Sequence, residues 1–264
     1  MSRNFELLQQ IGKDHDIFAV PPPTKEPEVL AEPASLAVEA AVEPAVTTTP
    51  PPEVLEKPGI EEVRTLVQRV FLLQGGHAPH VVVFAGTESG NGCSWICART
   101  AEALACQVSG SVCLVDANLR APGLHQQFDV PNNSGLSDAL LKSEPMNSFV
   151  TQLSLPNLSL VSGGAAGEAA QALLTSNRMR GRLRELRSMF DYVLVDTSAM
   201  NTSNDAIVLG AVSDGAILVL KANSSRKETA RNAVREFQTA SVKVFGAVLN
   251  QRTFPIPDAI YNKL

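Results

Sequence analysis

Six short apolar runs between Val81 and Leu249 constrain the fold of this chain more than any other feature. The runs are rich in β-branched residues and nearly continuous, which is typical of strands buried on both faces of a sheet. Helical patterns separate most of them, and this alternation predicts a doubly wound, mostly parallel α/β sheet with right-handed crossovers. The predicted strands are Val81–Ala85, Val112–Val115, Leu158–Val161, Tyr192–Val195, Ala216–Leu220 and Val244–Leu249, and the predicted helices Cys93–Gln107, Gln171–Met189, Asp205–Ala211 and Arg226–Thr239.

The stretch from Pro21 to Pro58 has a different composition. It holds ten of the 17 prolines, seven glutamates and two lysines, but no glycine and no aromatic residue. Its balance of −5 equals the formal charge of the whole chain, so the remainder is neutral. Such a stretch buries too little apolar surface to offset its ordering entropy. We therefore predict three parts: a short amphipathic segment at 1–18, a disordered linker at 19–58 and an α/β domain at 59–264, opening with a helix at 59–74.

Composition also excludes several classes of protein. A neutral domain without a long basic run argues against nucleic acid as a partner. No run approaches the roughly 18 apolar residues of a membrane span, and the charged first residues do not fit a signal peptide. The four cysteines, Cys93, Cys97, Cys106 and Cys113, are then expected to be reduced thiols in a cytosol. These features predict a cytoplasmic protein.

A glycine-containing loop, Gly86 to Ser94, joins the first predicted strand to a helix. Backbone amides in such a loop converge on an anion at the helix N-terminus. The phosphate-loop pattern GxxxxGK[ST] would place lysine at position 93 and a Mg²⁺-binding hydroxyl at 94. Ser94 is present, but Cys93 replaces the lysine and Thr87 the first glycine. This loop alone fits a nucleotide site or a simple glycine turn.

Two aspartates stand at strand ends on the same edge of the predicted sheet. Asp116 follows the second apolar run and Asp196 the fourth, while Asn250 ends the last. A carboxylate beside a phosphate loop holds Mg²⁺ or its water, although either aspartate alone also fits a helix cap or a turn. Ligands of parallel sheets bind at the carboxyl ends of the strands. Together with the glycine loop after the first strand, these two aspartates make three such strand ends on one sheet, which favours a phosphate site, and Asn250 is a polar group that could meet a base.

With these motifs the sequence resembles the bacterial tyrosine kinases of capsule and exopolysaccharide biosynthesis (the CpsD/CapB type), a branch of the MinD/ParA-like P-loop ATPases. The resemblance runs from about Gly59 to Asn250. VVVFAGTESGNGCSW is similar to the family's phosphate loop, and SVCLVDANLRAPGLHQQFDVPNNSGLSDALL to its second aspartate motif. FDYVLVDTSAMNTSNDAIVLGAVSDGAILVLKAN is similar to its Asp-Thr-Pro strand, and GIEEVRTLVQRV to the Glu-x-x-Arg helix through which members assemble. The implied fold is of P-loop NTPase type.

The resemblance implies ATP and Mg²⁺ as cofactors and assigns roles to particular residues. Asp116 and Asp196 would be catalytic, and together with Ser94 they would form the Mg²⁺ site. The ATP-binding set would be Gly90, Asn91, Gly92, Cys93, Ser94, Trp95, Asn250 and Arg252, the last two at the adenine.

Several departures from the family pattern concern charge. Cys93 removes the lysine that neutralises the phosphates, and such a clamp is usually the dominant catalytic contribution. Asn118 stands in place of a second aspartate, and Ser198-Ala199 in place of Pro-Pro. The family's tail cluster of tyrosines is missing. The chain has two tyrosines, and because Tyr192 lies in a predicted strand, only Tyr261 could accept phosphate. These changes predict weakened phosphoryl transfer.

Two functions follow from the resemblance. The first is an ATP-binding tyrosine kinase-like protein that regulates exopolysaccharide or capsule synthesis or export. The alternative is a non-catalytic adaptor, nucleotide-binding or nucleotide-free, of a membrane polysaccharide chain-length regulator. In either case the implied partner is a separate membrane-bound co-polymerase, which would recruit the chain to the inner membrane face. The Glu-x-x-Arg helix implies a homo-oligomer, although Val67 replaces the motif's second arginine and argues against a ring.

Three cysteines and a run of arginines can be explained by the fold alone, without a ligand or a partner. Cys97, Cys106 and Cys113 fit small core residues, whereas Cys93 at a helix N-terminus favours a lowered thiol pKa. The spacing of cysteines and histidines does not fit a metal-thiolate site. The run Arg178, Arg180, Arg182, Arg184 and Arg187 fits a solvated helix face, with an assembly surface as the alternative.

Overall fold

The computed structural model describes residues 60–73, 78–165 and 168–251. The predictions for 1–18 and 19–58, and those for Arg252 and Tyr261, lie outside the described residues. Among the described residues, no helix is both long and apolar enough to cross a lipid bilayer.

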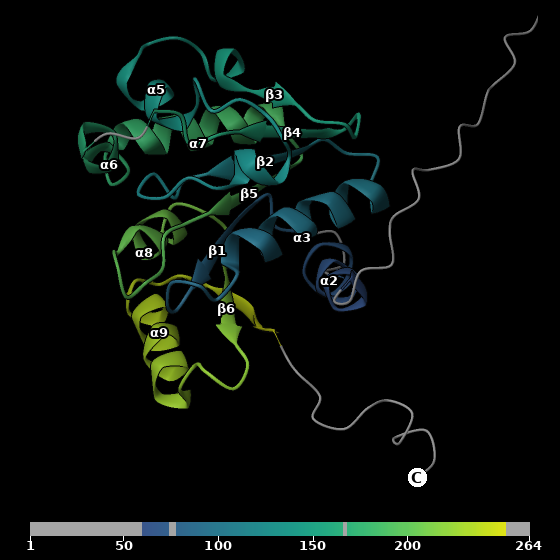
Figure 1. Cartoon of the computed structure of the whole chain (residues 1–264), viewed down its shortest axis with the longest axis vertical. Helices are drawn as coiled ribbons and strands as arrows, with labels where there is room; N and C mark the ends of the chain where they lie inside the picture. The colour runs from purple at the N-terminus through teal and green to yellow at the C-terminus, as the bar shows by residue number, and fades with distance from the viewer. Residues whose placement is uncertain (1–59, 74–77, 166–167, 252–264) are drawn as a thin grey trace, which may run out of the picture. The chain divides into compact units, whose positions relative to one another are not determined.

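One sheet of seven strands organises the described residues, in the order β3-β4-β2-β5-β1-β6-β7 (Figure 1). All neighbours are parallel except the short β3, which pairs antiparallel with β4. This confirms the mostly parallel, doubly wound fold. The strands are β1 (Val81–Gly86), β2 (Val112–Asp116), β3 (Thr151–Gln152), β4 (Leu158–Val161), β5 (Tyr192–Asp196), β6 (Gly215–Lys221) and β7 (Val244–Asn250).

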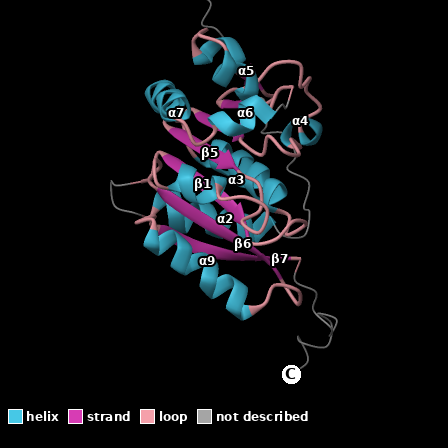
Figure 2. Ribbon diagram, turned by 90° about the vertical axis from the view of Figure 1, so that its left-hand side faces the viewer, coloured by secondary structure: helices cyan, strands magenta, loops and turns pink. Residues whose placement is uncertain are grey.

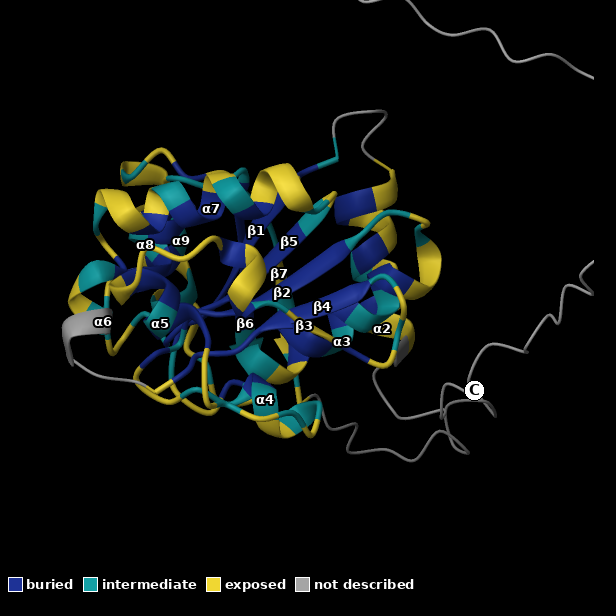
Figure 3. Ribbon diagram, turned by 90° about the horizontal axis from the view of Figure 1, so that it is seen from above, coloured by how far each residue is buried: buried dark blue, intermediate teal, exposed yellow. Residues whose placement is uncertain are grey.

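Helices cover both faces of this sheet, and its inner strands are largely buried, whereas the edge strands β3 and β7 are not (Figures 2 and 3). The core on one face includes residues of α2, η1, α3 and α4, and the core on the other includes residues of α5 to α9. The helices are α2 (Ile60–Val67), the π-helix η1 (Gln68–Leu72), α3 (Cys93–Gln107), α4 (Leu124–Gln127), α5 (Leu136–Leu141), the 3₁₀ helix η2 (Met146–Phe149), α6 (Glu168–Leu173), α7 (Asn177–Met189), α8 (Asp205–Gly210) and α9 (Lys227–Thr239).

The central strands β1 and β2 are buried along their whole length, which explains their unbroken apolar sequence. Helix α3 packs on them with small residues, among them Cys97, Ala98 and Ala101, all fully buried. Small side chains allow the helix backbone to approach the strands closely, and this approach fixes where α3 begins relative to the end of β1.

One predicted helix, Gln171–Met189, is in fact two helices. Helix α6 ends at Leu173, and Ser176 caps α7 by accepting a hydrogen bond from the Arg178 amide at 3.2 Å. The predicted helix at 59–74 is likewise α2 followed by the π-helix η1.

The arginine run on α7 is only partly a solvated face. Arg182 is buried, and its guanidinium donates to the carbonyls of Ala139 and Lys142 at 2.9 and 2.8 Å. Arg178 also donates to the Lys142 carbonyl, and Arg187 pairs with Asp214 at 2.9 Å. These three arginines therefore stabilise the fold, because they satisfy carbonyls at the end of α5 or pair with a residue at the start of the sheet, whereas Arg180 and Arg184 are exposed as predicted.

Candidate functional site

The loop from β1 to α3 has the backbone of an anion-binding turn. Gly90 and Gly92 have φ angles of 82° and 78°, and α3 begins at Cys93. The buried Asn91 side chain donates to Thr87 Oγ1 at 2.9 Å and to the Val219 carbonyl at 3.2 Å. These bonds hold the loop against β6, so that its glycines and the first amides of α3 face the carboxyl edge of the sheet.

The end of β7 lies directly on this loop. The Asn250 side-chain amide donates to the Asn91 carbonyl at 2.9 Å. A Cβ added at Gly92 would lie 2.2 Å from Asn250 Nδ2. The structure thus holds Asn250 on the phosphate loop, whereas the role predicted for it is a contact with the adenine. Trp95, in the first turn of α3, is 36% exposed.

We expect Gly92→Ala to destabilise the protein by about 1–2 kcal/mol, because the position needs a positive φ and lacks room for a methyl group. Gly181→Ala is the matched control, since nothing lies within 4 Å of a Cβ added there in the interior of α7. That change should instead stabilise by about 0.5–1 kcal/mol. Urea unfolding of both variants measures the difference, and equal effects would contradict the close contact with Asn250.

Asp116 and Asp196 are direct neighbours at the ends of β2 and β5. Asp116 Oδ1 accepts from the Asn118 amide at 3.2 Å, and Asp116 Oδ2 accepts from the amides of Gly123 and Leu124 at 2.9 and 3.0 Å. Asp116 therefore also acts as the cap that fixes the loop to α4. Burial nevertheless raises its pKa to about 6 against these hydrogen bonds.

Asp196 is less well compensated than Asp116. Both of its carboxylate oxygens are buried without a hydrogen-bond partner. Burial, followed by the charge of Asp116, raises its pKa to about 7. The Ser94 hydroxyl, the Cys93 thiol and the Thr197 amide lie near enough to lower that pKa in part, but none of them makes a hydrogen bond of good geometry to the carboxylate. A buried carboxylate left without a partner is the kind of group that a cation satisfies.

The prediction of a lowered thiol pKa at Cys93 is wrong. Burial raises this pKa well above its ordinary value, and the neighbouring Asp196 raises it further. The nearby carboxylate and the lost hydration outweigh the helix N-terminus, so Cys93 is a neutral thiol. Cys97 and Cys113 are buried as predicted, but the prediction of a core position for Cys106 is wrong, because it lies exposed near the end of α3.

A hydroxyl and carboxylate cluster, not recognised in the sequence as part of the site, follows β5. Asp205 Oδ2 accepts from the hydroxyls of Ser198 and Ser203 at 2.9 and 2.7 Å, and Arg120 Nε lies 3.8 Å from the same oxygen. We call these four residues the Asp205 cluster. Ser198 in place of the family's proline was the available signal, because a hydroxyl at a strand end can bond where proline cannot.

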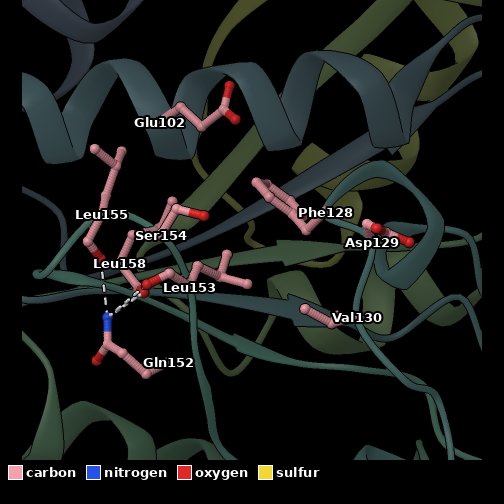
Figure 4. Close-up of a pocket in the computed structure, with 9 residues that line it drawn as sticks. All are labelled: Glu102, Phe128, Asp129, Val130, Gln152, Leu153, Ser154, Leu155 and Leu158. Carbon is pink, nitrogen blue, oxygen red and sulfur yellow. Dashed lines mark hydrogen bonds between the residues drawn. The ribbon is translucent and has the colours of Figure 1, made fainter. Parts of the chain in front are cut away.

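A separate pocket lies on the α3 face of the sheet, away from these residues (Figure 4). Its volume is about 260 Å³, and Gln152 on its wall is held by bonds to the carbonyls of Leu155 and Leu158 at 2.9 and 2.7 Å. The lining is Glu102, Phe128, Asp129, Val130, Gln152, Leu153, Ser154, Leu155 and Leu158. None of the predicted site residues contributes to it.

Comparison with known proteins yields one family model and several relatives. The model, cellulose biosynthesis protein BcsQ, matches residues 80–239. The chain is 30% identical to tyrosine-protein kinase YwqD of Bacillus subtilis (strain 168) over 190 residues, which cover 72% of this chain and 80% of YwqD.

Solved structures show the same fold. The chimerical protein CapA2B2 superposes with a TM-score of 0.70 at 24% identity, covering 76% of this chain and 88% of its own. The septum site-determining protein MinD from Pyrococcus horikoshii OT3, complexed with Mg-ADP, superposes with a TM-score of 0.57 at 19% identity, covering 69% and 76%. These likenesses confirm a P-loop NTPase fold of the MinD/ParA type.

Proposed function

We propose, from the premise that the chain belongs to the bacterial tyrosine kinase family of capsule and exopolysaccharide biosynthesis, that it binds ATP at the carboxyl edge of β1, β2 and β5 and regulates exopolysaccharide synthesis with weakened phosphoryl transfer. The observation that carries this proposal is the unpartnered, buried Asp196 carboxylate beside a glycine loop that has Cys93 in place of a lysine. The unpartnered carboxylate supports a phosphate site that depends on a cation, and the missing lysine supports slow phosphoryl transfer at that site.

The residues at the site fit Mg²⁺. This ion prefers oxygen ligands, usually one or two carboxylates with water and phosphate. Asp196 offers two buried oxygens without partners, and Ser94 and Asp116 lie next to it. Mg²⁺ bound there would neutralise phosphate charge. The chain's own contribution is to orient the phosphates through the amides of Gly90 to Ser94 and to exclude water from the two carboxylates.

We expect titration with Mg-ATP to change the fluorescence of Trp95, the only tryptophan, which is partly exposed in the first turn of α3. The loop amides should order around the phosphates, and ligand at about 100 times its Kd should stabilise the fold by about 2.7 kcal/mol. Because Cys93 supplies no cation, EDTA should abolish both effects. Trp95→Phe, followed by thermal shift, controls for changes of fluorescence unrelated to the site. The absence of both signals with millimolar Mg-ATP would contradict ATP binding.

A second candidate function is a non-catalytic adaptor of a membrane-bound polysaccharide co-polymerase. The neutral thiol of Cys93 and the backbone-bound oxygens of Asp116 favour it, since the thiol brings no positive charge to a transferring phosphate and three amides already occupy the carboxylate. Tyrosine phosphorylation assayed with wild type and Asp116→Asn separates the two. A rate in wild type that the variant loses would support phosphoryl transfer and contradict the adaptor, whereas no rate in either protein would contradict the transfer.

A further inference from the structure

The phosphate site has two carboxylates and no lysine at position 93, so a bound triphosphate needs positive charge from elsewhere in the chain. The loops that follow β1, β2 and β5 run over residues 87–92, 117–123 and 197–204, all of which the structure describes. Within these three loops the single lysine or arginine is Arg120.

Arg120 is loosely held in its present position. Its Nε lies 3.8 Å from Asp205 Oδ2, and its side chain is 43% exposed. Asp205 Oδ2 already accepts two hydroxyl hydrogen bonds, from Ser198 and Ser203. Only the arginine end of this ion pair is exposed, since Asp205 is buried, but the carboxylate keeps both hydroxyl hydrogen bonds if the guanidinium leaves, so that only one long ion pair is lost. Arg120 can therefore move at small cost.

The Asp205 cluster also lies against the phosphate loop. Between Ser198 and Ser203, the amides of Met200 and Asn201 donate to the carbonyls of Gly86 and Thr87 at 2.9 and 3.2 Å. In the loop that carries Arg120, the amide of Asn118 donates to Asp116, whose neighbour on the sheet is Asp196. Arg120 thus lies on a loop that borders the two carboxylates, and its present partner Asp205 bonds to a second loop that borders them.

We propose that Arg120 is the phosphate-binding cation of this site. When a nucleotide binds, the guanidinium moves away from Asp205 and contacts the terminal phosphates, in place of the lysine that Cys93 has replaced. The inference rests on the proposed ATP binding and deepens it. A guanidinium suits this role because its planar fork of donors matches phosphate oxygens in bidentate geometry and remains charged at all relevant pH values. Its long stem lets it act from a neighbouring loop.

The test compares Arg120→Gln with Arg184→Gln, a matched change on the exposed side of α7. Each full-length variant is titrated with Mg-ATP and with AMP, and Trp95 fluorescence reports binding. We expect Arg120→Gln to weaken Mg-ATP binding about 10- to 100-fold and to leave AMP binding unchanged, because only ATP carries the terminal phosphates. Arg120→Lys should recover part of the loss, and Arg184→Gln should match wild type.

A double-mutant cycle makes the inference specific. In a Cys93→Lys background the lysine supplies the missing charge, so Arg120→Gln should then weaken Mg-ATP binding by less than about threefold. If wild type binds Mg-ATP and Arg120→Gln binds it equally well, or loses ATP and AMP to the same extent, the role of Arg120 is wrong while the proposed function stands. If wild type binds neither nucleotide by fluorescence or thermal shift, the proposed function fails and the role of Arg120 fails with it.

Discussion

Replacing Asp196 by asparagine should stabilise the metal-free protein at pH 8 by on the order of 2–4 kcal/mol, because the change removes a buried charge that has no partner. The same argument fixes the pH dependence of wild type. The pKa values of Asp116 and Asp196 are raised to about 6 and about 7, so between pH 4 and 7 the folded state binds more protons than the unfolded state. The free energy of unfolding should therefore fall as pH rises through this range, and Asp196→Asn should flatten most of the slope.

Urea unfolding in EDTA from pH 4 to 8 measures both effects. Asp214→Asn is a control of opposite sign. Burial opposes the shift there, but the amides of Val81 and His80 and the guanidinium of Arg187 hold the Asp214 pKa below its ordinary value. The stability that Asp214 contributes is present at neutral pH and lost on acidification, so its removal should destabilise at pH 7. If Asp196→Asn proves less stable than wild type at pH 8, the carboxylate has a partner that the structure does not show.

Most of the sheet could be predicted from the sequence because its signal is local. All six apolar runs became strands, and helix α3 has the predicted bounds Cys93–Gln107. Unbroken β-branched runs have few alternatives to a doubly buried strand. The short elements α4, α5, η2 and β3 were not predicted, because pieces of two to six residues carry too few positions for a period to emerge.

The placement of site residues was also predictable, whereas their electrostatics were not. Parallel strands bring Asp116, Asp196 and Asn250 to one edge whatever the side chains are. The pKa of Cys93, in contrast, depends on burial and on Asp196, which is distant in sequence. Arg182 poses the same difficulty, because the carbonyls that draw it into the core belong to α5. Residues that are close in space but distant in sequence determine the pKa of Cys93 and the burial of Arg182, and a local sequence pattern carries no information about those neighbours.

Replacing Cys93 by lysine should tighten Mg-ATP binding about 10- to 100-fold and raise ATPase or tyrosine phosphorylation activity, because one cation would meet both the phosphates and Asp196. Without nucleotide, the new ammonium would be a partner for Asp196 and should lower its pKa. The pH dependence of stability should then weaken, as it should in Asp196→Asn. Unlike that variant, Cys93→Lys keeps the Asp196 carboxylate as a ligand for the metal.

Cys93→Met is the matched control for that change, since it adds length at the start of α3 without charge. It should leave Mg-ATP affinity within about threefold of wild type and keep the stability slope between pH 4 and 7. If lysine and methionine behave alike, charge at position 93 does not limit the site. If lysine restores affinity without activity, the limit instead lies at Asp116, whose oxygens the amides of Gly123 and Leu124 already occupy. The pair of variants therefore separates a site that lacks only its cation from one whose catalytic carboxylate has become structural.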